Sequence, residues 1–404
     1  MSDLVDTIRL FNAGRDPERL AMKFANMRAN AFAFLRGSCH LFYARLAEGA
    51  APPPDSPPAW ICGDLHLENF GSYKGDNRLV YFDLNDFDES ALAPLSWDLT
   101  RLLASVCVAA PTLKMQPDQA ELLCKDFIDA YGAALASGKP RWLERDTAQG
   151  LIKQLLDGVR ERKRVDLLNE RTHFEGRQRI LRCDGKHALA VDKKGQARAR
   201  ELVDACAAAL GDHGFFEVLD VARRIAGTGS LGVERYVVLV QGKGPPDKNY
   251  LLDVKLASPS SLTPHLRIAQ PNWASQAQRI VTIQGRVQAI STAFLHPVTL
   301  TRKSYVLRGL QPSEDRVSLD ASRKNFANVR ELLADMGRLV AWGQLRGAGR
   351  QGSADADALI EFGASRKSWE DELLASARAC ARQTTRDWES YAAAYDAHKF
   401  NLQE

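Results

Sequence analysis

Oxygen-bearing side chains recur at two short intervals near residue 70. Residues 62–69 read Cys-Gly-Asp-Leu-His-Leu-Glu-Asn, so Asp64 lies five positions before Asn69, and an apolar run at 79–82 leads to Asp86-Phe-Asp88. A carboxylate beside a hydroxyl can accept its proton, and amide and carboxylate oxygens can hold Mg²⁺. The pattern predicts phosphoryl transfer, with Asp64 as base or orienting group and Asn69 and Asp86 as metal ligands.

Neighbouring polar residues extend this prediction. Asp83 and Asp88 are second choices as metal ligands, and His66 is expected to orient the loop rather than act on substrate. Trp97-Asp98-Leu99 resembles the Asp-Leu that braces the catalytic loop in small-molecule kinases, which implies the same role for Asp98, twelve residues after Asp86. The alternative without a function is a turn in which Asp and Asn form local hydrogen bonds. The ordered set Asp64, Asn69, Asp86 and Asp98 makes this alternative less favoured.

A glycine-rich segment lies far downstream. Residues 227–232 read Gly-Thr-Gly-Ser-Leu-Gly, strand-like runs follow at 236–240 and 250–257, and the second run contains Lys255. Since β-branched residues follow the glycines, the pattern favours a β-hairpin over the helix of a dinucleotide fold. The predicted phosphate contacts are Gly227, Thr228, Gly229, Ser230, Gly232 and Lys255, and the bland alternative for Lys255 is a strand lysine that reaches solvent.

The pair of motifs is similar to that of small-molecule kinases such as the aminoglycoside and choline kinases. There Gly-Asp-x-His precedes the metal motif, as Gly63-Asp-Leu-His66 does here, but the glycine loop and lysine come first. The order in this chain therefore resembles a circular permutation. The resemblance implies ATP and Mg²⁺ as cofactors.

The chain also resembles a large bacterial family, domain-of-unknown-function family 2252, over roughly residues 20–395. Its marks here are Phe32-Ala-Phe-Leu-Arg-Gly37, Gly63–Gly71, Phe82–Glu89, Trp97-Asp-Leu-Thr-Arg101, Gly227–Gly232 and Asp253-Val-Lys255. This resemblance implies a kinase-like fold and brings no substrate.

One departure from kinases concerns the lysine. A kinase pairs it with a Glu on the next helix, expected here over Trp273–Phe294, yet no Asp or Glu occurs between Lys255 and Glu314. Either Gln276, Gln278 or Gln284 serves as a neutral acceptor, an acidic residue from elsewhere holds Lys255, or activity has been lost.

The predicted fold class is α+β, a two-lobed, permuted protein-kinase-like fold with a mostly helical catalytic lobe and an antiparallel β nucleotide lobe. Residues 1–213 carry the catalytic and metal loops, 214–312 form the β-rich nucleotide lobe, and 313–404 complete the helical lobe. Helices are expected over 5–48, 96–137, 142–170, 322–346 and 365–396.

Composition restricts the class of protein. The chain of 404 residues has a net charge of +4, no apolar run long enough to span a membrane, and no apparent signal peptide, which predicts a cytoplasmic protein. Its seven cysteines form no C-x-x-C pair, which argues against zinc and disulfides. Residues 160–200 hold thirteen Lys/Arg and six Asp/Glu, but lack interleaved aromatic residues, so nucleic-acid binding is not expected.

The favoured function is transfer of phosphate from Mg-ATP to an unidentified hydroxyl of a small molecule or protein. Three alternatives remain open: AMP transfer by the same fold, a nucleotide-binding pseudokinase that acts as an interaction module, and a metal-dependent hydrolase. The hydrolase would be built on Asp64, His66, Asp83, Asp86 and Asp88. The acceptor and the oligomeric state are not encoded in any motif.

Overall fold

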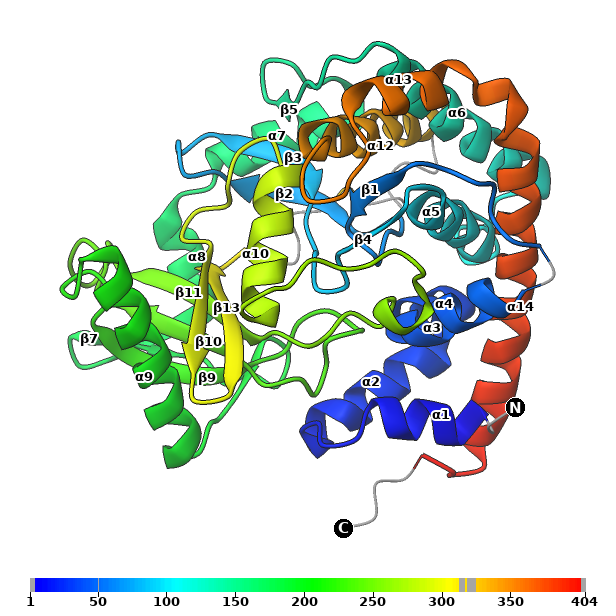
Figure 1. Ribbon diagram of the computed structural model, residues 1–404. Helices are drawn as coiled ribbons and strands as arrows, with labels where there is room; N and C mark the ends of the chain where they lie inside the picture. The colour runs from blue at the N-terminus through cyan, green and yellow to red at the C-terminus, as the bar shows by residue number, and fades with distance from the viewer. Residues whose placement is uncertain (1–3, 50, 312–316, 318–324, 401–404) are drawn as a thin grey trace.

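A curled antiparallel sheet and a large helical core make up a mixed α+β fold (Figure 1). The computed structural model describes residues 4–49, 51–311, 317 and 325–400. None of the described helices is long and apolar enough to cross a membrane.

The six-stranded sheet has the order β12-β13-β11-β10-β9-β8, and every neighbouring pair is antiparallel. Its strands are rich in Val, Leu and Tyr, and all six residues of β10 are buried, so both of its faces are covered. Helix α9 packs on one face through Leu202, Val203 and Cys206. The strands are β8 (Ala188–Leu189), β9 (Val218–Arg224), β10 (Arg235–Val240), β11 (Tyr250–Leu256), β12 (His296–Leu300) and β13 (Lys303–Gly309).

The register of this sheet places charged side chains together. Arg235 of β10 lies opposite Lys255 of β11. Because side chains alternate between faces along a strand, Asp253 lies on the same face as Lys255. The predicted hairpin is therefore present, and it delivers three charged residues to one side of the sheet.

Apolar side chains of α5, α6, α12, α13 and α14 form the main helical core, which also takes in Trp60 of β1. Helix α10 joins this core to the sheet through Ile280, Ile283 and Val287. The helices of this part are α5 (Ser96–Ala109), α6 (Pro117–Ala136), α7 (Gly150–Glu161), α8 (Arg164–Arg171), α9 (Lys193–Leu210), α10 (Gln276–Val287), α12 (Phe326–Gly347), α13 (Ala356–Ala364) and α14 (Glu370–Asp396).

Four N-terminal helices lie beside the C-terminal helix α14, so the two ends of the chain meet (Figure 1). Phe24 and Phe34 pack on Tyr391 there. Asp16 caps α2 by accepting a hydrogen bond from the Arg19 N–H at 3.0 Å, and Pro17 follows it at the first helical position. These helices are α1 (Leu4–Phe11), α2 (Pro17–Ala29), α3 (Ala31–Gly37) and α4 (Cys39–Glu48).

Short strands carry the loops of residues 62–69 and 85–90. β1 (Pro58–Ile61) pairs with β4 (Ala91–Pro94), and β3 (Val80–Leu84) lies between β2 (Phe70–Lys74) and β5 (Leu143–Glu144). Helix α12 packs against β1, where Trp60 closely approaches the backbone of Gly347. A separate hairpin comprises β6 (Thr172–Glu175) and β7 (Gln178–Leu181).

The sequence-based boundaries differ from the structure in several places. The helix expected over 142–170 is instead β5 followed by α7 and α8, which are separated because Arg162 is extended. The helix expected over Trp273–Phe294 runs only over Gln276–Val287, because Ser275 caps its first turn and Gln288 is extended. The sheet begins at β8 and is covered by α9, upstream of the expected start at residue 214. The first residues of the helix expected over 322–346 lie outside the described part of the chain.

Candidate functional site

A cavity of about 1300 Å³ separates the glycine loop, residues 227–232, from the loops of residues 62–69 and 85–90. Its walls include Asp64, Asn69, Asp86 and Lys255, together with the glycine loop. Motifs that are more than 130 residues apart in the sequence therefore share one concave surface. The volume suits a ligand larger than a simple metabolite.

Asp64 lies on the loop after β1, and its side chain is 21% exposed to the cavity. Its Oδ1 atom accepts a hydrogen bond from Arg101 Nε at 2.8 Å and also contacts Arg101 Nη2. Burial raises the pKa of Asp64, and the charge of Arg101 opposes that rise. Because Arg101 is fully buried, the ion pair fixes the position of the carboxylate while Oδ2 has no described hydrogen-bond donor.

Asp98, at the start of α5, braces this loop as the sequence predicts. Its two carboxylate oxygens accept hydrogen bonds from the N–H groups of Cys62 at 2.9 Å and Gly63 at 3.0 Å. Gly63 has φ +81°, and a Cβ atom there would lie 2.1 Å from the Glu89 carbonyl oxygen. Only glycine fits, so the two loops can approach closely.

Asn69 links the loop of residues 62–69 to the loop of residues 85–90. Its Nδ2 donates to the carbonyl oxygens of Asp64 at 3.0 Å and Asp86 at 3.2 Å, and its Oδ1 accepts from the Asp86 N–H at 2.8 Å. The residue is almost fully buried. These three hydrogen bonds fix the spacing between the loops of Asp64 and Asp86.

The Asp86–Asp88 turn faces the lysine of β11. Asp88 forms an ion pair with Lys255 Nζ, and its N–H donates to Asp86 Oδ1 at 3.2 Å. Desolvation tends to raise the pKa of Asp86, but the charges of Lys255 and Arg308 hold it below its usual value. Asp86 is therefore a carboxylate that stays ionised at neutral pH, with its side chain open to the cavity.

The structure shows which group holds Lys255 in place of a Glu on the following helix. An acidic residue from elsewhere, Asp88, holds the lysine, whereas Gln276 accepts from Arg279 and Gln284 bonds to Gln288. Helix α10 contributes Arg279 instead, which donates to the carbonyl oxygens of Asp88 at 2.8 Å and Ser258 at 2.9 Å. The helix thus fixes the backbone of the acidic turn.

Two predicted site residues, Asp83 and His66, form hydrogen bonds that support the fold. Asp83 lies outside the cavity, where it accepts hydrogen bonds from the Leu84 N–H at 2.8 Å and from Arg346 Nη2 at 3.3 Å. His66 lines the cavity, but its Nδ1 accepts from the Glu68 N–H at 3.1 Å, which shapes the loop as predicted.

The glycine loop turns its carbonyl groups toward the N-terminal helices. Gly232 accepts from the Asp16 N–H at 2.8 Å, and Gly229 accepts from Arg15 Nη1 at 2.8 Å. Among the described residues, no acceptor is recorded for the N–H groups of Gly227, Thr228, Gly229, Ser230 and Gly232. Such N–H groups at a cavity wall form a cradle for an anion.

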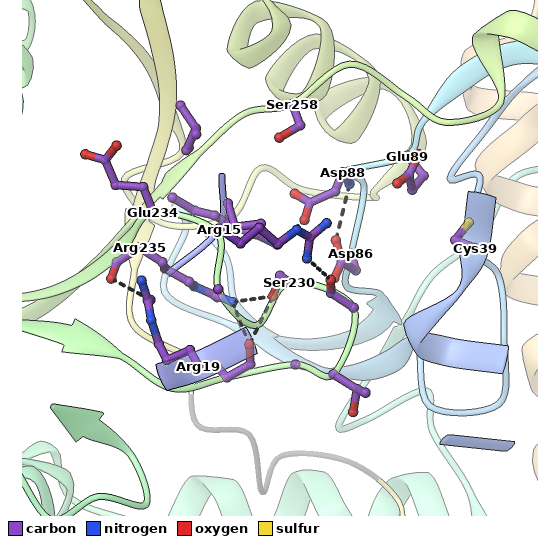
Figure 2. A pocket seen from close by; sticks show the side chains of 18 of the residues that line it. Arg15, Arg19, Cys39, Asp86, Asp88, Glu89, Ser230, Glu234, Arg235 and Ser258 are labelled. Carbon is purple, nitrogen blue, oxygen red and sulfur yellow. Dashed lines mark hydrogen bonds and ion pairs between the residues drawn. The ribbon is translucent and has the colours of Figure 1, made fainter. Parts of the chain in front are cut away.

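Behind the loop, one buried carboxylate gathers three arginines. Asp253 lies 2.6 Å from Arg224 Nη1, 2.6 Å from Arg235 Nη2 and 3.5 Å from Arg308 Nε. Burial would raise its pKa, but the arginines hold the pKa of Asp253 far below the usual range. Since Arg235 also donates to Ser230 Oγ at 3.3 Å, this cluster anchors the glycine loop to the sheet (Figure 2).

A family model of uncharacterized proteins conserved in bacteria, DUF2252, matches residues 15–394. The chain belongs to this family. Comparison with the curated proteins and with the solved structures gives no match.

Several residues of this DUF2252 chain that line the cavity or hold its lining residues were not singled out as site residues by sequence reasoning: Arg15 and Glu89 line it, and Arg101 and Asp253 pair with Asp64 and Arg235. Glu89, Arg101 and Asp253 lie within the family marks, so a signal for them existed. Arg15 reaches the site only through contacts between distant segments. Burial raises the pKa of Glu89, whose carboxylate accepts from the Ser261 N–H at 2.6 Å.

The oxygen ligands available for a metal are few. Within the described part of the chain, no three His, Cys, Asp or Glu side chains converge closely enough to hold an ion by themselves. Mg²⁺ commonly takes one or two carboxylates plus substrate phosphates and waters. Asp86, with Asn69 and Asp88 beside it, fits that incomplete ligand set, whereas a hydrolase centre that includes Asp83 does not.

Proposed function

We propose that this protein binds Mg-ATP in the cavity and transfers a phosphate group to a hydroxyl of an unidentified acceptor. The observation that carries the proposal is the meeting of both motif halves in one cavity, with Lys255 paired to Asp88 under the glycine loop. A permuted kinase-like arrangement accounts for this meeting, since the catalytic loops precede the nucleotide clamp in the chain.

Each part has a role in the proposed reaction. The N–H groups of the glycine loop and Lys255 bind phosphate oxygens, which draws Lys255 away from Asp88. Asp86, with Asp88 or Asn69, would hold Mg²⁺, whose charge offsets that of the phosphates. The carboxylate of Asp64, held by Arg101, faces the acceptor side of the cavity.

The transfer step balances as follows. The acceptor oxygen forms a bond to the γ-phosphorus, and the bond from that phosphorus to the β,γ-bridging oxygen breaks. ADP leaves with the electron pair, and Asp64 accepts the hydroxyl proton. The raised pKa of Asp64 makes it a better proton acceptor than an exposed carboxylate.

Thermal melting with and without saturating Mg-ATP tests binding. A ligand that binds only the folded state adds about 2.7 kcal/mol at a concentration 100 times its Kd. Lys255→Ala should remove most of the melting shift, while Lys248→Ala, an exposed lysine of the same hairpin, should keep it. Absence of both a melting shift and calorimetric heat in the wild-type protein would refute the proposal.

Labelled nucleotide then identifies the reaction. Incubation with a cell extract as the acceptor source should move label from γ-labelled ATP and none from α-labelled ATP. Transfer of α-label would instead support the AMP-transfer alternative. Binding without transfer of either label would leave the pseudokinase alternative.

A further inference from the structure

Two cations of the N-terminal helices converge on the tip of the glycine loop. Arg15 Nη1 donates to the carbonyl oxygens of Gly229 at 2.8 Å and Leu231 at 3.1 Å. Lys23 Nζ donates to the same Gly229 oxygen at 3.1 Å and to Asn12 Oδ1 at 2.8 Å. Among the described residues, neither cation forms an ion pair with a carboxylate.

Placing these two side chains away from water without a carboxylate partner costs free energy. Lys23 is completely buried, and burial lowers its pKa well below the usual range. Burial likewise lowers the pKa of Arg15 to about 10, against the opposing charges of Glu89 and Asp88. Buried cations are normally paired, because desolvating an unpaired charge is unfavourable.

The acids whose charges act on Arg15 do not contact it. Asp88 pairs with Lys255, and Glu89 accepts from the N–H and hydroxyl of Ser261. Both oppose the lowering of the Arg15 pKa through space, but among the described residues neither forms an ion pair with Arg15. A phosphate group from solution would form the direct ion pair that these acids do not.

The position of Arg15 identifies where that anion would sit. Arg15 lines the cavity beside the glycine loop, and Figure 2 shows it running toward the side that carries Asp86 and Asp88. A guanidinium has five N–H donors in a planar fork that matches phosphate oxygens. Only its Nη1 bonds to the glycine loop, so Nε and Nη2 remain for a ligand.

We propose that Arg15, backed by Lys23, is a phosphate-binding residue, and that a phosphate group in the cavity lies against the Nε and Nη2 atoms of its guanidinium. The inference rests on the proposed function for the use of the cavity and adds a residue from outside both motifs. The phosphate could belong to the nucleotide or to a second, phosphorylated ligand.

Calorimetric titration of the full-length Arg15→Gln variant tests this. The titrants are Mg-ATP, Mg-ADP, Mg-AMP and inorganic phosphate, and Arg9→Gln, an exposed arginine of α1, is the matched control. Loss of a charge-assisted contact should weaken binding of the contacted ligand about ten- to a hundredfold. Arg9→Gln should bind every titrant as the wild type does.

The pattern of loss identifies the source of the phosphate. Weaker binding of ATP alone assigns Arg15 to the outermost phosphate, and equal weakening of ATP and ADP assigns it to an inner one. Loss of inorganic phosphate binding with unchanged ATP binding assigns it to a second ligand. If Arg15→Gln binds all four titrants like the wild type, the inference is overturned.

Two controls separate this result from other failures. If Lys255→Ala loses ATP binding and Arg15→Gln binds all four titrants like the wild type, the inference fails and the proposed function stands. If the wild-type protein binds phosphate through Arg15 but binds no nucleotide, the inference stands and the proposed function fails. Should Arg15→Gln melt far below the wild type, Arg15→Lys keeps the charge and must retain more phosphate affinity than Arg15→Met.

Discussion

Two regions face each other across one cavity but differ in how their polar groups are paired. The catalytic-loop region comprises residues 62–69 and 86–89. The glycine-loop region comprises residues 227–232 with Arg15 and Lys23. In the first, protein partners hold Asp64, Asn69 and the loop backbone. In the second, among the described residues, the buried Lys23 and the half-buried Arg15 form no ion pair with a carboxylate, and the N–H groups of Gly227–Ser230 and Gly232 have no hydrogen-bond acceptor. The first region is held by its own side chains, and our proposal completes the second with an anion.

The contrast has a simple physical origin. Carboxylates and amides that position a reacting group must stay in place before the ligand arrives, since positioning during the reaction costs free energy. Donors that bind a ligand must instead remain available to it. The predictions below test this contrast in order of decreasing expected effect.

The largest effect is expected for Asp64→Asn. Loss of a group that accepts the proton should reduce phosphate transfer about 10²- to 10⁴-fold. Nucleotide binding should persist, because the proposed function places Asp64 at the acceptor and not at the glycine loop. Radiolabel transfer and calorimetry measure the two properties, with Asp55→Asn, an exposed aspartate, as the control. Equal loss of ATP affinity and transfer would contradict the separation of roles.

Asp253→Asn tests whether the glycine-loop region has its own anchor. The variant removes the carboxylate that forms ion pairs with Arg224, Arg235 and Arg308. Breaking a buried ion pair from one side typically costs about 3–5 kcal/mol of unfolding free energy. Urea unfolding should show such a loss.

The control for that experiment is an exposed ion pair. Asp157 pairs with Lys153 at 3.6 Å within α7, both side chains are 46% exposed, and exposed pairs contribute about 0.2–1 kcal/mol. Asp157→Asn should therefore be nearly neutral. Similar losses in both variants would mean that the arginine cluster does not anchor the loop.

Asp98→Asn probes the brace of the catalytic-loop region. An amide presents one oxygen, so one of the two N–H groups of Cys62 and Gly63 loses its acceptor. A buried donor left without a partner costs about 1–3 kcal/mol. Urea unfolding should show this loss, whereas Asp118→Asn, exposed on α6, should change stability little. An unchanged stability of Asp98→Asn would show that the loop needs no brace.

The smallest effect is a pH dependence of that brace. Burial outweighs the hydrogen bonds from Cys62 and Gly63 and raises the pKa of Asp98 to about 6, against 3.8 for an unperturbed aspartate. Between these values the folded protein holds a proton that the unfolded chain has released. Stability from this group is therefore fully present below about pH 3.8 and is lost as pH rises from there through about 6.

The measurement compares wild type and Asp98→Asn at pH 7 and pH 5. The difference between their unfolding free energies should grow by about 1 kcal/mol at pH 5, since only the wild type has the titrating group. Other carboxylates titrate alike in both proteins and cancel. A difference that does not change with pH would place the pKa of Asp98 near its ordinary value.

Sequence reasoning located much of the candidate site. Asp64, Asn69, Asp86, Lys255 and the glycine loop all line the cavity, because each lies on a loop or strand end that short patterns reveal. Asp83 shows where the same reasoning was too permissive. It lies within β3, and its side chain bonds to Arg346 outside the cavity.

The partner of Lys255 shows the opposite case. The chain between Lys255 and Glu314 has no acidic residue, so sequence spacing alone left the partner open. Asp88 fills that role from 167 positions upstream. A contact of that separation has no local pattern, since it depends on how the sheet packs over the acidic turn.

The sequence by itself determined the local chemistry of this protein: which loops carry carboxylates, where glycine permits close approach, and which strand presents a lysine. Periodicity and turn residues act over a few positions, so these features can be inferred from short segments. The tertiary structure alone decided which charges meet. It brought Arg15 and Lys23 to the glycine loop and Arg101 to Asp64, because burial of the apolar faces of distant helices fixes such contacts.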